Sequence, residues 1–230
     1  MSVKSQNKKW FKAYKRIIGI FYRKPKFIYL DEQVTEPSLI LSNHVSSKAP
    51  VKWEIYFNRS FRFWGVAEMT QGPKAVYRYL SSTYFHQKKH WNKTLAKIVG
   101  FIATPFVNLF YRGMDLIPTY NDIRFTITIR ESTKTVINGS DLIIFPEDSS
   151  HGYKDHLTYF FSGFVALAEN ILKKGIDIPI FAAYYQKKKN TFIIDKGIRY
   201  SKLKALFKEP KAIALAMKNR LNELAEQHSN

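Results

Sequence analysis

The sequence has no cysteine among its 230 residues. This absence excludes disulfide bonds, a thiol nucleophile and any metal site built on cysteine. Long apolar runs are missing too, since none reaches the roughly 18 uninterrupted residues of a membrane-spanning helix. The first residues interleave lysines with apolar positions and lead to no small-residue cleavage site, which is not typical of a signal peptide. These features favour a cytoplasmic protein.

Acidic residues are scarce. The chain carries 18 of them against 37 lysines and arginines, a formal net charge of +19, and none precedes Asp31. Such an imbalance predicts an anionic partner, which is a membrane lipid, a nucleic acid or a phosphorylated small molecule. Nucleic acid is the least favoured, because the chain has no Gly-rich phosphate loop, zinc-ligand spacing or RNA-binding aromatic signature. The length predicts one domain.

The N-terminal stretch predicts an amphipathic helix over Asn7–Arg23, ended by Pro25. Aromatic and aliphatic residues recur at helical spacing, and lysines and arginines fill most of the remaining positions. A purely basic polar face suits the surface of an anionic membrane, where each cation contributes about 1 kcal/mol. The alternative is an ordinary helix that packs its apolar stripe on the core. We therefore divide the chain into a helix at residues 1–25 and a domain at residues 26–230.

The remaining segments alternate between strand-like and helix-like patterns, which predicts a single-domain α/β fold with a mostly parallel central sheet flanked by helices. One predicted helix covers Asn121–Val136, with Ile123, Ile127 and Thr128 facing inward, and another covers Leu157–Lys174. The apolar stretch Lys97–Tyr111 is interrupted by Pro105. It is either a buried segment or an exposed ledge where an acyl chain or a membrane docks.

Two predicted strands end in residues that can do chemistry. The apolar run Leu142–Phe145 stops at Pro146 and is followed by Glu147 and Asp148. Far upstream, the run Leu39–Ser42 is followed by Asn43 and His44. In open α/β sheets, ligands bind outside the carboxyl ends of the strands. We expect the two strand ends to meet and form one site.

Four short motifs follow one another in a suggestive order: Asn43-His44, then Gly113 through Ile117-Pro118, then Phe145-Pro146-Glu147, and then Ile178-Pro179-Ile180. Each lies at the start or the end of a predicted strand. The series resembles the glycerolipid acyltransferase family of the lysophosphatidic acid acyltransferase type, over roughly Ile40–Ala183. The family blocks are Asn-His-x4-Asp, Gly-x-Ile-Pro-Val-x-Arg, Phe-Pro-Glu-Gly-x-Arg-Ser and Val-Pro-Ile-x-Pro.

The resemblance implies transfer of an acyl group from acyl-CoA or acyl carrier protein, used as a co-substrate without any other cofactor. The acceptor would be a hydroxyl of a lysolipid or another glycerol-phosphate-like molecule, at the inner face of the cell membrane. His44 would act as the general base, since a neutral histidine suits that task near pH 7. Glu147 would belong to the acceptor-binding loop. No metal-ligand spacing is present, so we expect no metal site.

The sequence departs from the family pattern at the charged positions. Ala49 stands where the family has the Asp that orients the histidine, and Asn121 and Ser150 stand where it has arginines. We therefore hypothesise that Asp148 orients His44, with Glu147 as the alternative. Glu54 is a poor substitute, because it lies about 140° further round a helix than Ala49.

The candidate acceptor-binding residues fall near the altered blocks. Phosphate contacts are expected to have moved to lysines or an arginine nearby, and small polar side chains complete the set: Asn43, Lys48, Arg124, Ser149, Ser150 and Lys154. His151 is a reserve base. The main functional hypothesis is an active acyltransferase, and the alternative is an inactive relative that binds lipid.

Overall fold

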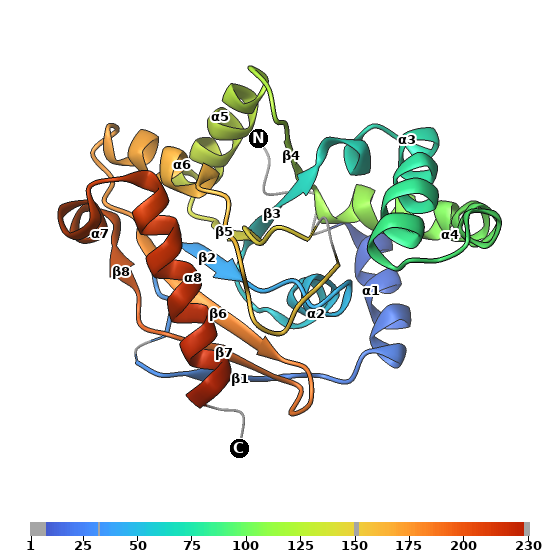
Figure 1. The fold of residues 1–230 in the computed structure, drawn as a ribbon, viewed down its shortest axis with the longest axis horizontal. Helices are drawn as coiled ribbons and strands as arrows, with labels where there is room; N and C mark the ends of the chain where they lie inside the picture. The colour runs from blue at the N-terminus through green and yellow to red at the C-terminus, as the bar shows by residue number, and fades with distance from the viewer. Residues whose placement is uncertain (1–7, 32, 150–151, 228–230) are drawn as a thin grey trace.

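An eight-stranded sheet forms the centre of the computed structural model, which describes residues 8–31, 33–149 and 152–227 (Figure 1). The strand order is β1-β7-β6-β2-β5-β3-β4, and β8 pairs with β6. Only the pairs β6–β7 and β6–β8 are antiparallel among these strands. The strands are β1 (Lys26–Tyr29), β2 (Leu39–Ser42), β3 (Phe61–Val66), β4 (Ile117–Thr119), β5 (Asp141–Ile144), β6 (Pro179–Gln186), β7 (Thr191–Ile194) and β8 (Ile198–Arg199).

Both faces of the sheet are covered by helices, as the sequence predicted for the α/β class. The strand β2 shows why: Leu39 and Leu41 enter one core cluster and Ile40 enters the other, because successive side chains of a strand point to opposite faces. One cluster also contains residues of α5 (Phe125–Ile137), α6 (Gly163–Leu172), α7 (Tyr200–Phe207) and α8 (Pro210–Gln227). The other contains residues of α1 (Lys9–Phe21), α2 (Lys48–Tyr56) and α4 (Lys93–Met114).

The N-terminal helix α1 packs into this second cluster. Phe11 is fully buried, and its ring lies against Phe110 of α4 at a centroid distance of 5.9 Å. Gly113 makes this close packing possible, since a Cβ atom at that position would lie 2.0 Å from the Phe11 ring. On the side of Phe11, therefore, this helix packs its apolar residues on the core, which is the alternative to membrane binding considered above. The same helix leaves Ile17, Ile20 and Phe21 exposed.

The helix α4 differs from the sequence prediction. It is 22 residues long and continues through Pro105, so the proline does not end it. Its length and composition would allow it to cross a membrane, and it is the one helix among the described residues for which this holds. About a fifth of its most apolar stretch is buried. Phe101 is 74% exposed and Phe106 is 63% exposed. Of the two interpretations of Lys97–Tyr111, the exposed ledge is the one that the structure shows.

Other predictions of helix position were wrong in detail. The helix α5 begins at Phe125, and Ile123 is 83% exposed while Ile127 is 37% exposed. Thr128 is fully buried, so the prediction for this residue is confirmed. Most of the inner face consists of small polar residues: Thr128 donates a hydrogen bond to the Pro118 carbonyl, and Ser132 accepts one from Trp64. The helix predicted from Leu157 begins only at Gly163.

The secondary structure between β3 and β4 was predicted only in part. The chain forms a 3-10 turn η1 (Ala67–Thr70), the helix α3 (Pro73–Arg78) and a π-helical segment η2 (Tyr79–Lys88) before it enters α4. In Figure 1 these elements lie together beside α4, at the side of the sheet opposite α7. The short elements β8 and α7 were not predicted either, because the apolar pattern of residues 198–207 is too brief to define them.

The contact between Phe11 and Gly113 gives a prediction about stability. We expect Gly113→Ala to lower the free energy of unfolding by about 1–3 kcal/mol, because the added methyl group forces the ring out of its site. Gly19→Ala in α1 is the matched control, since its Cβ would meet Tyr56 at an ordinary 3.6 Å. The control should be neutral or stabilising. Urea unfolding measures both, and equal effects would contradict the proposed packing.

Candidate active site

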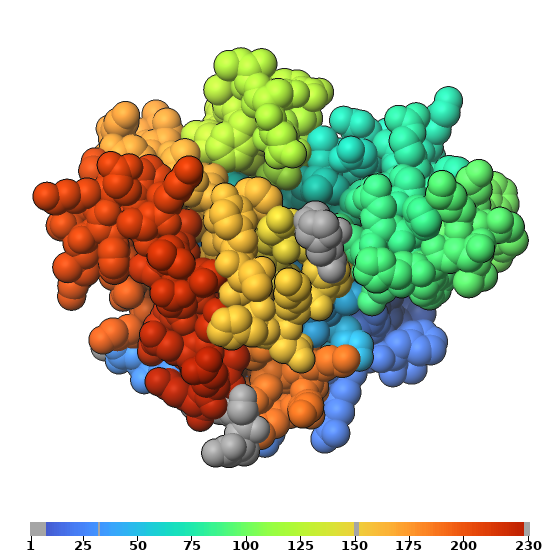
Figure 2. Space-filling view, in the orientation of Figure 1, coloured from blue at the N-terminus to red at the C-terminus, as the bar shows by residue number. Residues whose placement is uncertain are grey.

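The ends of β2 and β5 meet, as the sequence predicted. The two strands are parallel neighbours, so the residues that follow Ser42 and Ile144 emerge at the same edge of the sheet. There the main-chain N–H of His44 donates a hydrogen bond to Oε1 of Glu147, at 2.8 Å. Figure 2 shows the chain that follows β5 at the surface of this face, beside the C-terminal helix. This hydrogen bond joins two loops that are 103 residues apart in sequence.

Asn43 was predicted to bind the acceptor, but the structure gives its side chain another task. The amide is buried, donates to the Tyr185 carbonyl at 3.1 Å and accepts from the Tyr185 N–H at 2.6 Å. These two bonds continue the pairing of β2 with β6 beyond the last strand residue. Asn43 therefore fixes the backbone from which His44 projects, and its role toward the acceptor stays a prediction.

The imidazole of His44 lies between two aromatic rings. Its centroid is 4.8 Å from Phe145 and 4.9 Å from Tyr153, and the second pair is stacked. Its Nδ1 faces the main-chain carbonyl of Ser46 at hydrogen-bonding distance. Because a carbonyl oxygen only accepts, Nδ1 must carry the proton, and in the neutral ring Nε2 carries the free lone pair. The ring is thus held in the tautomer that a general base at Nε2 requires.

The Ser46 carbonyl reaches the ring through an unusual turn. Val45 has φ 41° and Ser46 has φ 60°, so two successive residues other than glycine adopt left-handed backbone. This conformation is disfavoured, most of all for a β-branched residue such as Val45. The Ser46 hydroxyl also lies 3.0 Å from the hydroxyl of Tyr84 in η2. Strain of this kind indicates that the surrounding structure enforces the turn, and its effect is to direct a carbonyl at His44.

The pKa values of the site follow from enclosure and charge. Burial, together with the nearby positive charge of Lys88, lowers the pKa of His44 from 6.5 to about 4, against the opposing effect of the Ser46 carbonyl. Burial raises the pKa of Glu147 to about 7, opposed by the His44 N–H and by Lys88. The imidazole is therefore neutral at pH 7, while Glu147 is close to its midpoint.

Lys88 is a site residue that sequence reasoning missed. It is the last residue of η2, and its ammonium donates a hydrogen bond to Oγ of Ser149 at 2.7 Å. The ammonium also lies 5.5 Å from the centroid of Tyr153, the ring that stacks on His44. In sequence, Lys88 is one of several lysines near a histidine and a tryptophan, and nothing in that pattern indicates that it faces the site.

The other predicted residues are distributed differently. Asp148 is exposed, and its main-chain N–H donates to the Tyr159 carbonyl at 3.2 Å. Ser46, not Asp148, supplies the contact at Nδ1 of His44, so a pair of His44 with Asp148 stays a prediction. Ser149 lies at the site as the partner of Lys88. Ser150 and the reserve base His151 lie outside the described residues.

The three cations predicted to bind phosphate are exposed. Arg124 forms a salt bridge with Asp122 at 2.6 Å and lies over the ring of Tyr120, beyond the edge strand β4. In the sheet, β4 is three strands away from β2, and neighbouring strands lie about 4.8 Å apart. The backbone of Arg124 therefore lies far from that of His44 along the same edge of the sheet. Lys48 opens α2 and Lys154 follows Tyr153, both at the surface.

Glu54 has a different partner, as expected. Its buried carboxylate pairs with Lys15 of α1 at 3.1 Å, and its second oxygen has no hydrogen-bond partner among the residues that the structure describes. Burial raises the pKa of Glu54 to about 7, against the opposing charge of Lys15. Glu54 therefore joins α2 to α1 and does not orient His44. In the part of the chain that the structure describes, no group of three or more metal-ligating side chains gathers.

The fold is that of a known acyltransferase structure. The crystal structure of the 1-acyl-sn-glycerophosphate (LPA) acyltransferase PlsC from Thermotoga maritima superposes with a TM-score of 0.57 and 10% sequence identity, covering 96% of this chain and 79% of that one. No family model matches the sequence, and no curated protein matches it. The similarity establishes the acyltransferase-like α/β fold that the four motifs implied.

The state of His44 can be tested directly. We expect its imidazole to stay neutral from pH 8 down to about 5, since burial and Lys88 hold its pKa at about 4. Nitrogen chemical shifts in NMR, assigned by comparison with His44→Gln, should show a protonated Nδ1 and an unprotonated Nε2 across that range. A titration midpoint near 6.5, or the opposite tautomer, would contradict the arrangement described.

Proposed function

We propose that this protein is an acyltransferase that moves an acyl group from a thioester to a hydroxyl of a glycerophospholipid-like acceptor, with His44 as the general base. The observation that carries the proposal is the contact between Nδ1 of His44 and the Ser46 carbonyl, which leaves Nε2 as the basic atom. The fold similarity to an acyltransferase supports the same reaction class. Acyl-CoA and acyl carrier protein are the two candidate donors, and no further cofactor is needed.

The proposed reaction requires one proton transfer and one displacement. Nε2 of His44 takes the proton of the acceptor hydroxyl, and the oxygen attacks the carbonyl carbon of the thioester. The C–O bond forms and the C–S bond breaks. The imidazolium then returns its proton to the departing thiolate, so that the products are an ester and a free thiol. Throughout this cycle the Ser46 carbonyl holds Nδ1–H and keeps the ring in one orientation.

The Ser46 carbonyl takes, in this proposal, the orienting role that the resembling family gives to its Asp. Ala49, where the resembling family has that Asp, is fully buried in α2 and carries no polar group. A carbonyl fixes the tautomer as a carboxylate does, although it carries no negative charge to stabilise the imidazolium. For this reason the loss of the Asp does not by itself favour the inactive alternative, a lipid-binding protein without turnover.

An assay of thioester consumption tests the reaction. With acyl-CoA or acyl carrier protein and a mixture of lysolipids, we expect His44→Ala to lower the turnover by about 10²–10⁴, the usual contribution of a general base. His86→Ala is the control, because that ring bonds the Trp91 carbonyl in another loop. Undiminished turnover in His44→Ala would rule out the proposed base. A wild-type protein inactive with every donor would favour the lipid-binding alternative.

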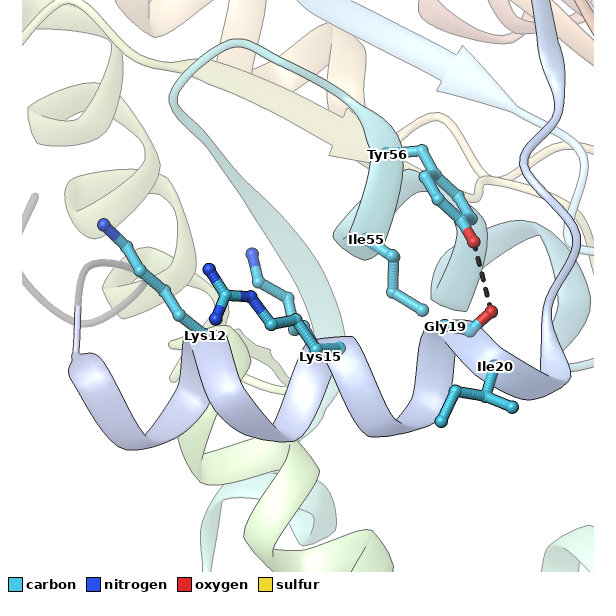
Figure 3. Close-up of a pocket in the computed structure, with 7 residues that line it drawn as sticks. Lys12, Lys15, Gly19, Ile20, Ile55 and Tyr56 are labelled. Carbon is cyan, nitrogen blue, oxygen red and sulfur yellow. Dashed lines mark hydrogen bonds between the residues drawn. The ribbon is translucent and has the colours of Figure 1, made fainter.

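We further propose that the protein works on the surface of an anionic membrane. The apolar ledge of α4 and the exposed residues of α1 lie on adjacent helices, since Tyr14 donates a hydrogen bond to the Phe106 carbonyl. Cations accompany them: a groove of about 570 Å³ between α1 and α2 is lined by Lys12, Lys15 and Arg16, with Ile20 and Ile55 beside them (Figure 3). Lys15 is paired with Glu54, and Lys12 and Arg16 add further positive charge beside the apolar side chains. This combination fits a leaflet containing anionic lipid.

Liposome flotation tests the membrane proposal. We expect the double variant Lys12→Glu/Arg16→Glu to bind vesicles of anionic lipid at least about thirtyfold more weakly, since each cation contributes about 1 kcal/mol. Phe101→Ser/Phe106→Ser should weaken binding to all vesicles. Leu215→Ser is the control, because it changes an exposed residue of α8 on the other face of the sheet. Added salt should weaken the binding of the wild type to anionic vesicles. Binding that changes neither with the charge of the lipid nor with salt would contradict the proposal.

A further inference from the structure

The turn that orients His44 needs support from outside its own loop. Val45 and Ser46 adopt left-handed backbone, at φ 41° and φ 60°, and neither is a residue type that tolerates this conformation well. Within the loop, the Lys48 N–H donates a long hydrogen bond of 3.3 Å to the Val45 carbonyl. The Val45 side chain packs on the second core cluster. Ser46, whose carbonyl faces the imidazole, is therefore the residue that needs a further contact.

The hydroxyl of Tyr84 supplies that contact. It lies 3.0 Å from the hydroxyl of Ser46, a residue 38 positions earlier in the chain, and either oxygen can donate the hydrogen. Among the described residues, Tyr84 is the partner that the Ser46 side chain has in another element. Since the hydroxyl and the carbonyl belong to the same residue, fixing the first restricts the direction of the second.

The segment η2, which carries Tyr84, is closely packed on its neighbours. It lies against α4, where a Cβ atom at Gly100 would be 3.2 Å from the Cβ of Ser81. The ring of Tyr84 meets Phe85 edge-on at a centroid distance of 5.1 Å, and both rings pack on a small core cluster formed by α3 and η2. The Tyr84 hydroxyl is therefore presented by a part of the fold that is built independently of the loop it supports.

The same segment contacts both loops of the site. Tyr84 bonds the loop that follows β2, and Lys88, four residues further on, bonds Ser149 in the loop that follows β5. The segment is π-helical, so that the Lys89 N–H reaches the Tyr84 carbonyl five residues back, at 3.1 Å. Segments of this kind are rare and occur frequently at functional sites. Its form here lets one element hold two loops that are far apart in sequence.

We propose that Tyr84 is a positioning residue for His44: its hydroxyl holds Ser46 in the left-handed turn, so that the Ser46 carbonyl keeps the proton on Nδ1 of the imidazole. Tyr84 acts through Ser46 and takes no part in the proton transfer. The inference rests on the proposed role of His44 as the base. It assigns to a tyrosine of η2 the support on which the orienting carbonyl depends.

The hydroxyl of Tyr84 has a consequence for the imidazole that its ring alone does not have. Without the hydroxyl, the disfavoured turn can relax and the Ser46 carbonyl leaves Nδ1. The neutral imidazole then also adopts the tautomer with its proton on Nε2, in which the proposed basic atom carries no free lone pair. The fraction of molecules that can accept a proton at Nε2 falls, and the rate falls with it.

Nitrogen chemical shifts of His44 at pH 7 test the proposal in Tyr84→Phe, which keeps the ring and removes only the hydroxyl. We expect both nitrogen shifts to move toward intermediate values, as in a mixture of the two tautomers, while the wild type shows a protonated Nδ1. Tyr200→Phe is the matched control, because it removes a hydroxyl contact of the same 3.0 Å length, to Glu169 in α6. Unchanged shifts in a folded Tyr84→Phe would overturn the inference.

A double-mutant cycle tests whether Tyr84 acts through Ser46. Ser46→Ala removes the Ser46 hydroxyl and keeps the carbonyl, so it should change the His44 shifts as Tyr84→Phe does. The double variant should show no larger change than either single variant, because both substitutions remove the same contact. Additive effects would show that Tyr84 influences His44 by another route, and would also overturn the inference. Urea unfolding of each variant shows that the proteins compared are folded.

Turnover separates this inference from the proposed reaction. Where acyl transfer is measured, Tyr84→Phe should lower kcat by about two- to tenfold, the factor that one hydrogen bond contributes, and leave KM unchanged. If the His44 shifts depend on Tyr84 but the wild type is inactive with every donor, the positioning stands and the reaction fails. If acyl transfer is observed and Tyr84→Phe changes neither the shifts nor kcat, the reaction stands and the inference about Tyr84 fails.

Discussion

The hydrogen bond from the His44 main chain to the Glu147 carboxylate is the constraint on which the site depends. Parallel pairing brings the ends of β2 and β5 to one edge of the sheet, but it does not fix the loops beyond them. The carboxylate ties the first loop to the second, and the side chain of Asn43 ties the first loop to β6 on the other side. His44 is therefore held between three adjacent strands, and its ring can be oriented by a single carbonyl.

The sequence allowed most of the strands, their largely parallel arrangement and the meeting of the two strand ends to be predicted. Short apolar runs that stop at polar residues carry this information, because a parallel strand that is buried on both faces is apolar along its whole length. The contact that orients His44 could not be found in this way. It comes from a main-chain carbonyl, and its direction depends on the left-handed backbone of Val45 and Ser46, which no side-chain motif indicates.

The remaining errors share a physical cause, which is that apolar periodicity was taken as the measure of burial. In α5 the buried face is made of threonine and serine, whose hydroxyl groups bond to neighbouring backbone and side chains and so tolerate burial. In α4 several apolar residues are exposed, Phe101 and Phe106 among them, and Pro105 removes only one intrahelical bond. Lys88 was missed because its position depends on how the π-helical segment η2 ends, which is a property of the fold.

Position 49, where the resembling family has an Asp, is Ala49 here, so the proposed base depends on other groups. A histidine that acts as a base needs the correct tautomer before the reaction and stabilisation of its positive charge during it. The Ser46 carbonyl meets the first need, whereas burial and Lys88 both work against the second. Glu147, with its pKa raised to about 7 by burial, contributes only part of a negative charge. In the proposed reaction the residues around His44 therefore set its tautomer fully but stabilise its positive charge only in part.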